Sequence, residues 1–251
     1  MSEARQNAAA GARPALSIIV PCLNEEQNLP ILLNKLVALV EHHGLAAEIL
    51  IVDDCSDDYT FREAFVFSAK DPRVKALHKG LPRGIGHAIR HGIAHAAGKV
   101  GVVVMGDLVD PLGAIPDFYS RIVEDGYHLT LLSRYLDKAD SANIPFSYRF
   151  YQFWYRVLCR LLVGVTVRDI TYAFRGFDLD YVRGLNLQSG GFEISPEITL
   201  KTWLSGGRIC EIKGRQGRRL AGESKFFFSR EGAGYTRVLL QAAMQRFCGR
   251  R

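Results

Sequence analysis

The sequence has no long apolar run and no closely spaced pair of cysteines. Its apolar stretches fall short of the roughly 18–20 residues that a membrane-spanning helix requires, so we expect no transmembrane helix. The five cysteines are odd in number and widely separated, which argues against a zinc knuckle or a redox dithiol and favours a reducing compartment. Residues 1–14 lack the apolar core of a signal peptide, and we predict that they form a disordered leader.

The composition is that of an ordinary globular protein with a basic second half. Of 251 residues, 48% are apolar and 23% are charged, which excludes a largely disordered chain and allows a sizeable core. The net charge is +6, and residues 205–251 hold eleven basic residues against three acidic ones. This excess predicts an anionic partner: nucleic acid, a phosphate-bearing substrate or an anionic membrane surface. No nucleic-acid recognition motif accompanies it, whereas interleaved aromatic residues suit a membrane interface.

Strand-like and helix-like segments alternate along most of the chain. Short β-branched runs predict strands, and apolar residues at helical spacing predict helices between them. This alternation predicts an α/β fold with a mostly parallel sheet, whose functional residues lie beyond the carboxyl ends of the strands. The expected strands are 16–21, 48–53, 74–77, 100–105, 129–132 and 208–213, and the expected helices are 29–40, 61–69, 84–97, 112–123, 147–163 and 196–203.

Three of the expected strands end in acidic or turn-forming residues, at 21–25, 53–54 and 106–107. Carboxylates that converge at such an edge can hold a divalent cation and can accept hydrogen bonds from a nucleoside. Asp107 and Asp110 are close enough in sequence to share one metal site. The alternative is that an acid after a strand caps the next helix, which is common for an isolated Asp-Pro pair such as Asp110-Pro111.

Five motifs occur in one order along the chain, and together they carry a family resemblance. The motifs are Pro-Cys-Leu-Asn-Glu at 21–25, Val-Asp-Asp-Cys-Ser at 52–56, Gly-Ile-Gly-His-Ala at 84–88, Asp-Ile-Thr-Tyr-Ala-Phe-Arg at 169–175 and Arg-Leu-Ala-Gly-Glu-Ser-Lys at 219–225. On these motifs, from residue 16 to residue 225, the chain resembles the family 2 inverting glycosyltransferases of the Rossmann-like GT-A fold. Within that family it is most similar to the polyprenol-phosphate sugar synthases of the dolichyl-phosphate mannosyltransferase type.

The resemblance implies a nucleoside pocket, a diphosphate site with a metal ligand, and two cations that close over the donor pyrophosphate. The fork of an arginine and the point charge of a lysine both suit phosphate oxygens. The implied nucleotide-sugar-binding residues are Pro21, Leu23, Glu25, Asp53, Asp54, Gly106, Asp107, Arg219 and Lys225. The implied catalytic residues are Asp107, Arg134, Arg219 and Lys225, and the candidate metal ligands are Asp107 and Asp110.

The chain departs from the family pattern at the metal motif. The family has Asp-x-Asp, whereas this chain has Met105-Gly-Asp107, and Val109 stands where a polar residue is expected. Binding of Mg²⁺ or Mn²⁺ then depends on Asp107, with Asp110, phosphate oxygens and water as further candidate ligands. Mg²⁺ commonly keeps several waters and few protein ligands, so such a site is feasible. Weakened or altered metal dependence is equally consistent with the sequence.

The first functional hypothesis is transfer of a sugar from a GDP- or UDP-sugar to a polyprenyl phosphate, with inversion at the anomeric carbon. A phosphate acceptor is already an anion, so it needs cations rather than a strong base, and Arg134, Arg149 and Arg156 are the candidates. We expect a glycosyltransferase domain at 15–230 followed by a basic amphipathic tail at 231–251. We expect a peripheral protein at the cytoplasmic face of a membrane, with a membrane-protein partner as an open alternative.

Other functions stay open from the sequence. A family 2 enzyme acting on a hydroxyl of a glycan, peptide or natural product would need a general base, and Glu193 and Glu197 are the available carboxylates. A non-catalytic nucleotide-sugar-binding module is the alternative raised by Met105. Histidines recur every four residues at 87–95, but no acidic partner shares their face, so we do not expect a zinc site. The glycines at 84–86 lack the third glycine of a dinucleotide fingerprint.

Overall fold

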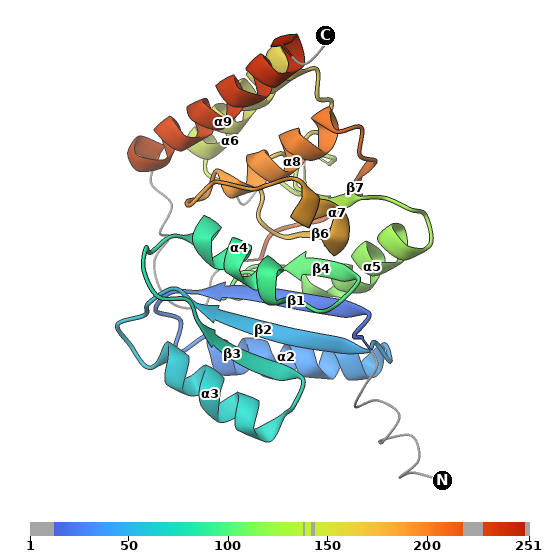
Figure 1. Ribbon diagram of the computed structural model, residues 1–251. Helices are drawn as coiled ribbons and strands as arrows, with labels where there is room; N and C mark the ends of the chain where they lie inside the picture. Colours follow the sequence, from blue (N-terminus) through green and yellow to red (C-terminus); the bar gives the residue numbers. More distant parts are fainter. Residues whose placement is uncertain (1–12, 138, 142–143, 218–227, 249–251) are drawn as a thin grey trace.

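The computed structural model describes residues 13–137, 139–141, 144–217 and 228–248. Its centre is a seven-stranded sheet in the order β3-β2-β1-β4-β6-β5-β7 (Figure 1). The strands are β1 (Leu16–Cys22), β2 (Ala47–Asp53), β3 (Val74–His78), β4 (Val100–Val103), β5 (Leu129–Ser133), β6 (Arg175–Asp178) and β7 (Ile209–Lys213). The helices are α2 (Leu29–His42), α3 (Thr60–Lys70), α4 (Ile85–His95), the 3₁₀ turn η1 (Leu112–Ala114), α5 (Ile115–Val123), α6 (Phe146–Val163), α7 (Leu179–Gly184), α8 (Ile194–Leu204) and α9 (Phe228–Cys248).

The sheet is mostly parallel, which confirms the predicted α/β class. β1 pairs in parallel with β2 and β4, β2 with β3, and β5 with β7. The carboxyl ends of β1, β2 and β4 therefore lie at one edge of the sheet, where the sequence places its acidic and turn residues. β6 runs antiparallel to both of its neighbours, β4 and β5. The sequence analysis did not predict this strand or α7.

Each face of the sheet has its own hydrophobic core because successive side chains of a strand point to opposite faces. On β1, Ile18 belongs to a cluster shared with α2, α3 and α5, whereas Ile19 belongs to a cluster shared with α4, α6, α8 and α9. β2 divides in the same way, with Ile51 on the first side and Val52 on the second. Helices thus cover both faces of the sheet.

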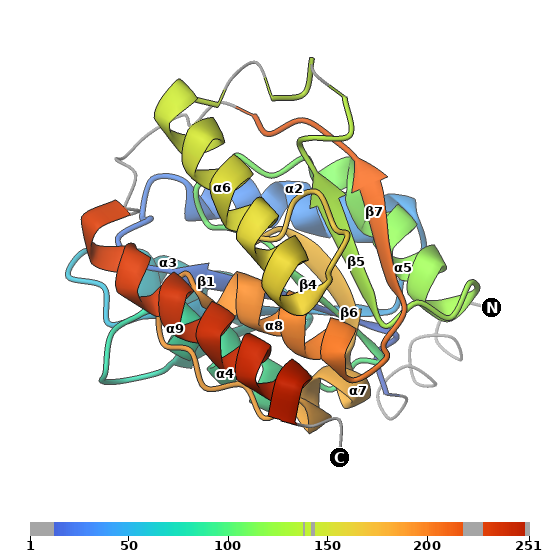
Figure 2. The ribbon, with the colours of Figure 1, turned by 90° about the horizontal axis from the view of Figure 1, so that it is seen from above.

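We call the cluster that contains Ile19 and Val52 the second core. Helices α6, α8 and α9 form a layer outside it (Figure 2). Tyr235 of α9 is 2% exposed and belongs to this core, and the hydroxyl of Tyr155 on α6 donates to its backbone carbonyl at 3.3 Å. The segment expected to be a basic tail from residue 231 is thus packed helix as far as residue 248, while the domain boundary at 230 stays a prediction. Nowhere in the described ranges is a helix both long and apolar enough to cross a membrane.

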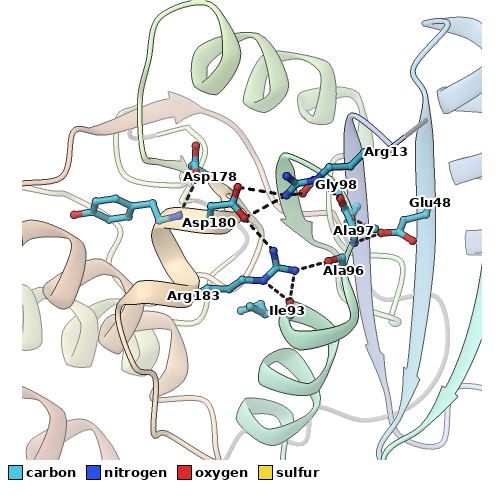
Figure 3. A network of polar contacts seen from close by, with 11 residues as sticks. Arg13, Glu48, Ile93, Ala96, Ala97, Gly98, Asp178, Asp180 and Arg183 are labelled. Carbon is cyan, nitrogen blue, oxygen red and sulfur yellow. Dashed lines mark hydrogen bonds and ion pairs between the residues drawn. The ribbon is translucent and has the colours of Figure 1, made fainter. Parts of the chain in front are cut away.

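A polar network fixes the carboxyl end of α4 at the far edge of the sheet (Figure 3). Arg183 of α7 donates to the carbonyls of Ile93 (3.0 Å) and Ala96, which no helical partner satisfies. Arg13 donates to the two carbonyls that follow, and both arginines bind the exposed carboxylate of Asp180. Residues from the start, middle and later part of the chain therefore hold α4 in place, with its amino end directed to the other edge of the sheet.

Gly92 allows α4 to lie close against the sheet, which generates a stability prediction. A Cβ at this position would come within 2.4 Å of Ile19 Cγ2 on β1, so Gly92→Ala must displace the helix. Such overpacking should lower the free energy of unfolding by about 1–3 kcal/mol. Gly113→Ala is the matched control because a Cβ there meets nothing within 4 Å. Urea unfolding that gives both variants the same stability would contradict this account.

Candidate active site

A cavity of about 950 Å³ opens at the carboxyl ends of β1, β2 and β4 and extends to the amino-terminal parts of α6 and α9 and to residues 190–193, which precede α8. It brings together most of the residues that the sequence assigned to the nucleotide sugar, although these come from three separate motifs. Asp53 and Asp110 are not among its lining residues in the part of the chain that the structure describes. The assigned residues that line it are Pro21, Leu23, Glu25, Asp54, Gly106, Asp107 and Arg134.

The adjacent acids after β2 have different surroundings. Asp53 accepts hydrogen bonds from the imidazole Nδ1 of His78 (2.9 Å) and the amide of Ser56 (3.2 Å), and it is buried away from the cavity. Asp54 lines the cavity and accepts from the amide of Gly84 at 2.7 Å, with Lys79 Nζ at 2.8 Å from its other oxygen. Of the two assigned acids, Asp54 is therefore the one placed to meet a nucleoside, and it also anchors the turn that starts α4.

Asp107 and Asp110 likewise differ in what their carboxylates can do. Asp107 lines the cavity on the loop after β4, with the amide of Val109 3.4 Å from one oxygen. Asp110 accepts from the amide of Met105 at 2.7 Å and from the hydroxyl of Tyr172 at 2.6 Å. Burial, reinforced by the neighbouring carboxylate of Asp107, raises the pKa of Asp110 to about 7. Asp110 thus braces the loop, and its geometry does not support the predicted role as metal ligand.

The donor set fits a divalent cation only when a bound substrate supplies most of the ligands. No group of three His, Cys, Asp or Glu side chains in the described residues can hold a metal. Asp107 offers one carboxylate to the cavity, and Met105 lines it where the family has a second. Mg²⁺ and Mn²⁺ tolerate such sites when phosphate oxygens and water complete the shell. The residues present therefore suit a cation that binds together with a diphosphate.

Arg134, the arginine assigned to phosphate, is held in a buried ion pair. Its Nε and Nη2 donate to the two oxygens of Asp169 at 2.7 and 3.1 Å, and its Nη1 donates to Gln216 at 3.0 Å. Burial works against the charged form, but the Asp169 carboxylate outweighs it and raises the pKa of Arg134. Arg134 lines the cavity as a fixed cation. Because its guanidinium nitrogens already donate to Asp169 and Gln216, its main role is to hold the cavity wall in shape.

Tyr172 connects this ion pair to the loop after β4, and the sequence analysis gave it no role. Its ring lies under the guanidinium of Arg134, with 4.1 Å between Cζ and the ring centroid, and its hydroxyl donates to Asp110. The family pattern for 169–175 is Asp-x-Thr-x-x-Phe-Arg, and Tyr172 stands at a position where this pattern specifies no residue type. The motif therefore could not single it out. The buried side chain of Tyr172 therefore braces both the loop after β4 and the part of the cavity wall that carries Arg134.

Glu193 and Glu197, the candidate general bases, both have partners. The carboxylate of Glu197 accepts from the amides of Gln188 (2.9 Å) and Ser189 (2.8 Å) and pairs with Lys201 at 2.7 Å. Burial raises its pKa, but these hydrogen bonds outweigh that effect and keep the pKa below its ordinary value. Glu193 lines the cavity, 3.1 Å from Nη2 of Arg237. Glu197 is thus a loop anchor, and Glu193 is the only one of the two that faces the cavity.

Of the three arginines that the sequence assigned to the acceptor, Arg134 is the one among the described lining residues of the cavity. Arg149 and Arg156 lie on α6 outside the described lining, where Arg149 is exposed and Arg156 donates to the carbonyl of Arg168 at 3.3 Å. Arg83 and Arg237 line it instead. Arg237 stands alone in the basic segment, so no motif could single it out. Arg219 and Lys225 lie outside the described residues, and their roles stay predictions.

The family model that matches this chain is "Glycosyl transferase family 2", over residues 17–185. The matched region runs from β1 to the end of α7 and includes the loop after β4, and it covers more than half of the chain. The chain therefore belongs to glycosyl transferase family 2, and it is an enzyme of the glycosyltransferase class.

Its relatives include several lipid-phosphate sugar transferases. It is 32% identical over 220 residues to a dolichol-phosphate mannosyltransferase of Pyrococcus furiosus, covering 84% of this chain and 58% of the relative. It is 27% identical over 212 residues to an undecaprenyl-phosphate mannosyltransferase of Micrococcus luteus, covering 82% of this chain and 85% of the relative. The chain thus spans little more than half the length of the first of these relatives. The family resemblance predicted from the motifs is confirmed.

Solved structures support the fold. A glucosyl-3-phosphoglycerate synthase from Mycobacterium tuberculosis, in complex with Mn²⁺, uridine diphosphate and glucosyl-3-phosphoglycerate, superposes with a TM-score of 0.67. The match covers 95% of this chain and 81% of that structure at 18% identity. At this identity the likeness establishes the shared GT-A architecture, and the ligands belong to the neighbour.

The first activity prediction concerns Asp107. Asp107→Ala removes the one carboxylate that the loop after β4 offers to the cavity, so it should remove an effect of several kcal/mol on the leaving diphosphate. We expect loss of transfer with an unchanged circular dichroism spectrum. Asp117→Ala, which removes an exposed acid from the first turn of α5, is the control and should keep full activity. A folded Asp107→Ala protein with full activity would rule out this assignment.

The second concerns the brace made by Tyr172. Tyr172→Phe keeps the ring under Arg134 but leaves a buried oxygen of Asp110 without its hydroxyl donor, which should cost about 1–3 kcal/mol of stability. Because the lost bond fixes the loop that carries Asp107, the donor KM should rise while the acceptor KM stays near its original value. Tyr119→Phe on α5 is the control for loss of a tyrosine hydroxyl. Equal changes in both KM values would show that Tyr172 acts only through general stability.

Proposed function

We propose that this protein transfers a sugar from a nucleoside-diphosphate donor to a polyprenyl phosphate, with inversion at the anomeric carbon. The observation that carries the proposal is the extent of one cavity. It runs from the acidic strand ends that suit a nucleotide to helices α6 and α9, so donor and acceptor can meet within it. Two relatives, a dolichol-phosphate mannosyltransferase and an undecaprenyl-phosphate mannosyltransferase, support a lipid phosphate as acceptor.

The donor end of the cavity combines hydrogen-bond acceptors with a phosphate-compatible loop. Glu25 and Asp54 are the acids that line this end of the cavity, and Arg83 lies at the same end. Whether the base is guanine or uracil is left to the assay below. A divalent cation at Asp107, Mg²⁺ or Mn²⁺, would neutralise the charge that develops on the leaving diphosphate. Asp107 would orient that diphosphate, and Asp110 and Tyr172 would hold Asp107 in position.

The acceptor end favours a phosphate over a hydroxyl. A hydroxyl nucleophile must lose a proton to a base, whereas a phosphate oxygen is already anionic. Glu197 is engaged by two amides and a lysine, and Glu193 is paired with Arg237, so neither carboxylate is a free base in the described residues. This pairing supports the lipid-phosphate hypothesis over a hydroxyl acceptor.

Arg237 is our candidate for the first contact with the acceptor phosphate. Its side chain is 59% exposed and has one described partner, the Glu193 carboxylate at 3.1 Å. A phosphate can reach this arginine because its side chain is exposed and is held by one described ion pair. Arg134 would complete the wall from a fixed position. Arg149 and Arg156, which the sequence suggested, would then act outside the cavity.

We place this reaction at a membrane surface, since a polyprenyl phosphate keeps its chain in the bilayer. Five free cysteines suit a reducing compartment and favour the cytoplasmic face. A membrane-protein partner would be a further means of attachment. The placement and the partner are parts of the proposal.

The test compares two arginines with a short-chain polyprenyl phosphate in the absence of vesicles. Arg237→Gln should raise the acceptor KM about tenfold to a hundredfold, the cost of one lost charge-assisted hydrogen bond of about 1.5–3 kcal/mol, and should leave the donor KM unchanged. Arg149→Gln, an exposed arginine outside the cavity, is the matched control and should change neither value. If Arg149→Gln raises the acceptor KM instead, the assignment made from sequence is correct and Arg237 is not the contact.

Glu193→Gln distinguishes the two acceptor chemistries. With a phosphate acceptor no proton must be taken, so kcat should stay within a fewfold of its original value across the pH range. With a hydroxyl acceptor, kcat should collapse and the acidic limb of the pH profile should disappear. Collapse of kcat in a folded Glu193→Gln protein would reject the lipid-phosphate mechanism.

A further inference from the structure

Helices α6 and α9 expose most of the large apolar side chains that lie on the surface of the described protein. They run side by side in the same direction, since Tyr155 in the middle of α6 contacts Tyr235 in the first half of α9, and Arg246 donates to the carbonyl of Leu161 near their ends (Figure 2). We call their exposed apolar side chains the α6–α9 face. Its members are Phe146, Phe150, Phe153, Trp154, Leu158 and Leu161 of α6, and Leu240, Met244 and Phe247 of α9.

The α6–α9 face is strongly exposed. On α6 its members recur at helical spacing over the whole helix, and on the second half of α9 they follow at intervals of four and three residues. Phe146 is 74% exposed, Leu161 is 70% and Phe247 is 67%. The aromatic rings contact one another, with 6.3 Å between the centroids of Phe150 and Trp154. An exposed apolar surface of this kind marks an interaction site.

The charges beside the face are of one sign on α6. That helix carries three arginines and no acidic residue. Arg149 and Arg160 are exposed, and the guanidinium of Arg149 lies 6.0 Å from the ring centre of Phe146. Long basic side chains beside aromatic rings are typical of helices that lie in the headgroup region of a bilayer, where the rings enter and the cations remain at the phosphates.

The same two helices form part of the cavity wall. Pro145, Tyr148 and Gln152 line the cavity at the start of α6, and Gly234 and Arg237 line it near the start of α9. The α6–α9 face therefore begins beside the acceptor end of the cavity. A lipid whose headgroup enters this end can keep its chain in the environment that the face occupies.

We infer that the α6–α9 face docks the protein onto the surface of an anionic phospholipid bilayer. Its aromatic rings insert at the boundary between headgroups and acyl chains, and Arg149 and Arg160 contact lipid phosphates. The inference rests on the proposed function in one respect: docking would present the cavity to a lipid acceptor. Docking itself requires no nucleotide and no acceptor, so it is tested separately.

A bilayer suits the face better than a second copy of the chain. A twofold contact would bring the same patch of both copies together, and α6 would then set its arginines against arginines with no acid of its own to pair them. An anionic bilayer offers a phosphate to each arginine and an apolar layer to each ring. Charge complementarity therefore selects the bilayer, and self-association becomes an outcome of the test.

The chain has two tryptophans, and one of them reports directly on the face. Trp154 is 50% exposed on α6, whereas Trp203 packs against the second core. In the full chain with Trp203→Phe, emission comes from Trp154 alone. With vesicles of phosphatidylcholine and roughly one third phosphatidylglycerol at low salt, this emission should shift to the blue. Lipids brominated near the headgroup end of the acyl chains should quench it, and binding should weaken as salt rises. Cosedimentation without quenching of Trp154 would overturn the assignment of this face.

A paired substitution tests the same face without a fluorescence readout. Phe150→Ser with Leu161→Ser should weaken partitioning into these vesicles at least about tenfold, because two apolar side chains no longer leave water. Phe65→Ser with Val66→Ser on α3 also removes two exposed apolar side chains, at 62% and 40% exposure, and should leave partitioning unchanged. Thermal unfolding of all variants guards against misfolding. Equal loss in both pairs would mean that the vesicles bind the chain without a specific face.

Sedimentation velocity without vesicles tests the alternative that a second copy of the chain occupies the α6–α9 face. A dimer that Phe150→Ser and Leu161→Ser dissociate, in a protein that ignores vesicles at low salt, would replace the bilayer with a second copy. Transfer to the short-chain acceptor gives an independent readout of the proposed function. If transfer proceeds while vesicles are ignored, the docking inference fails alone; if vesicles bind through the face and no polyprenyl phosphate is glycosylated, the proposed function fails alone.

Discussion

The buried ion pair of Arg134 with Asp169 is the interaction on which the rest of the site depends. It fixes segment 169–175 beside the end of β5, and that segment carries Tyr172 to Asp110 and leads into β6. At its other end Arg175, fully buried, donates to the carbonyl of Ser195 at 2.7 Å and so ties the same segment to α8. Removing one partner of a buried ion pair leaves an uncompensated charge, so a substitution of Arg134 or Asp169 should strongly destabilise this wall of the cavity.

This arrangement explains how the loop after β4 keeps its shape with one acid fewer than its family pattern. Met105 replaces the first carboxylate, and its backbone amide is bound by Asp110, which Tyr172 holds in turn. Hydrogen bonds within the protein thus fix the loop before any cation arrives. Asp107 is left to face the cavity, where a diphosphate and a cation can bind together. The site is preorganised by its polar network rather than by a complete set of metal ligands.

The sequence predicts local features well and three-dimensional pairings poorly. The β-branched runs and the acids after them indicate where β1, β2 and β4 end. Asp54 and Asp107 were predicted at these strand ends, and both line the cavity. The antiparallel β6 escaped prediction because four residues carry little periodic signal. Arg149 and Arg156 share a basic helix with the cavity-lining Tyr148 and Gln152, but composition cannot tell which side of a helix faces inward. The metal-ligand role of Asp110 stays a prediction, and its hydrogen bond to Tyr172, 62 residues away, could not be predicted because it leaves no trace in sequence.

The most direct test of the central claim is a transfer assay with the purified full chain. GDP- and UDP-sugars are supplied in turn with Mg²⁺ or Mn²⁺, with and without polyprenyl phosphate, and the products are identified by mass spectrometry. The account predicts that one donor gives a glycosyl phosphate lipid, that the product forms only when polyprenyl phosphate is present, and that its anomeric configuration is opposite to that of the donor. Transfer from the same donors to a soluble hydroxyl acceptor, with no lipid product, would contradict it.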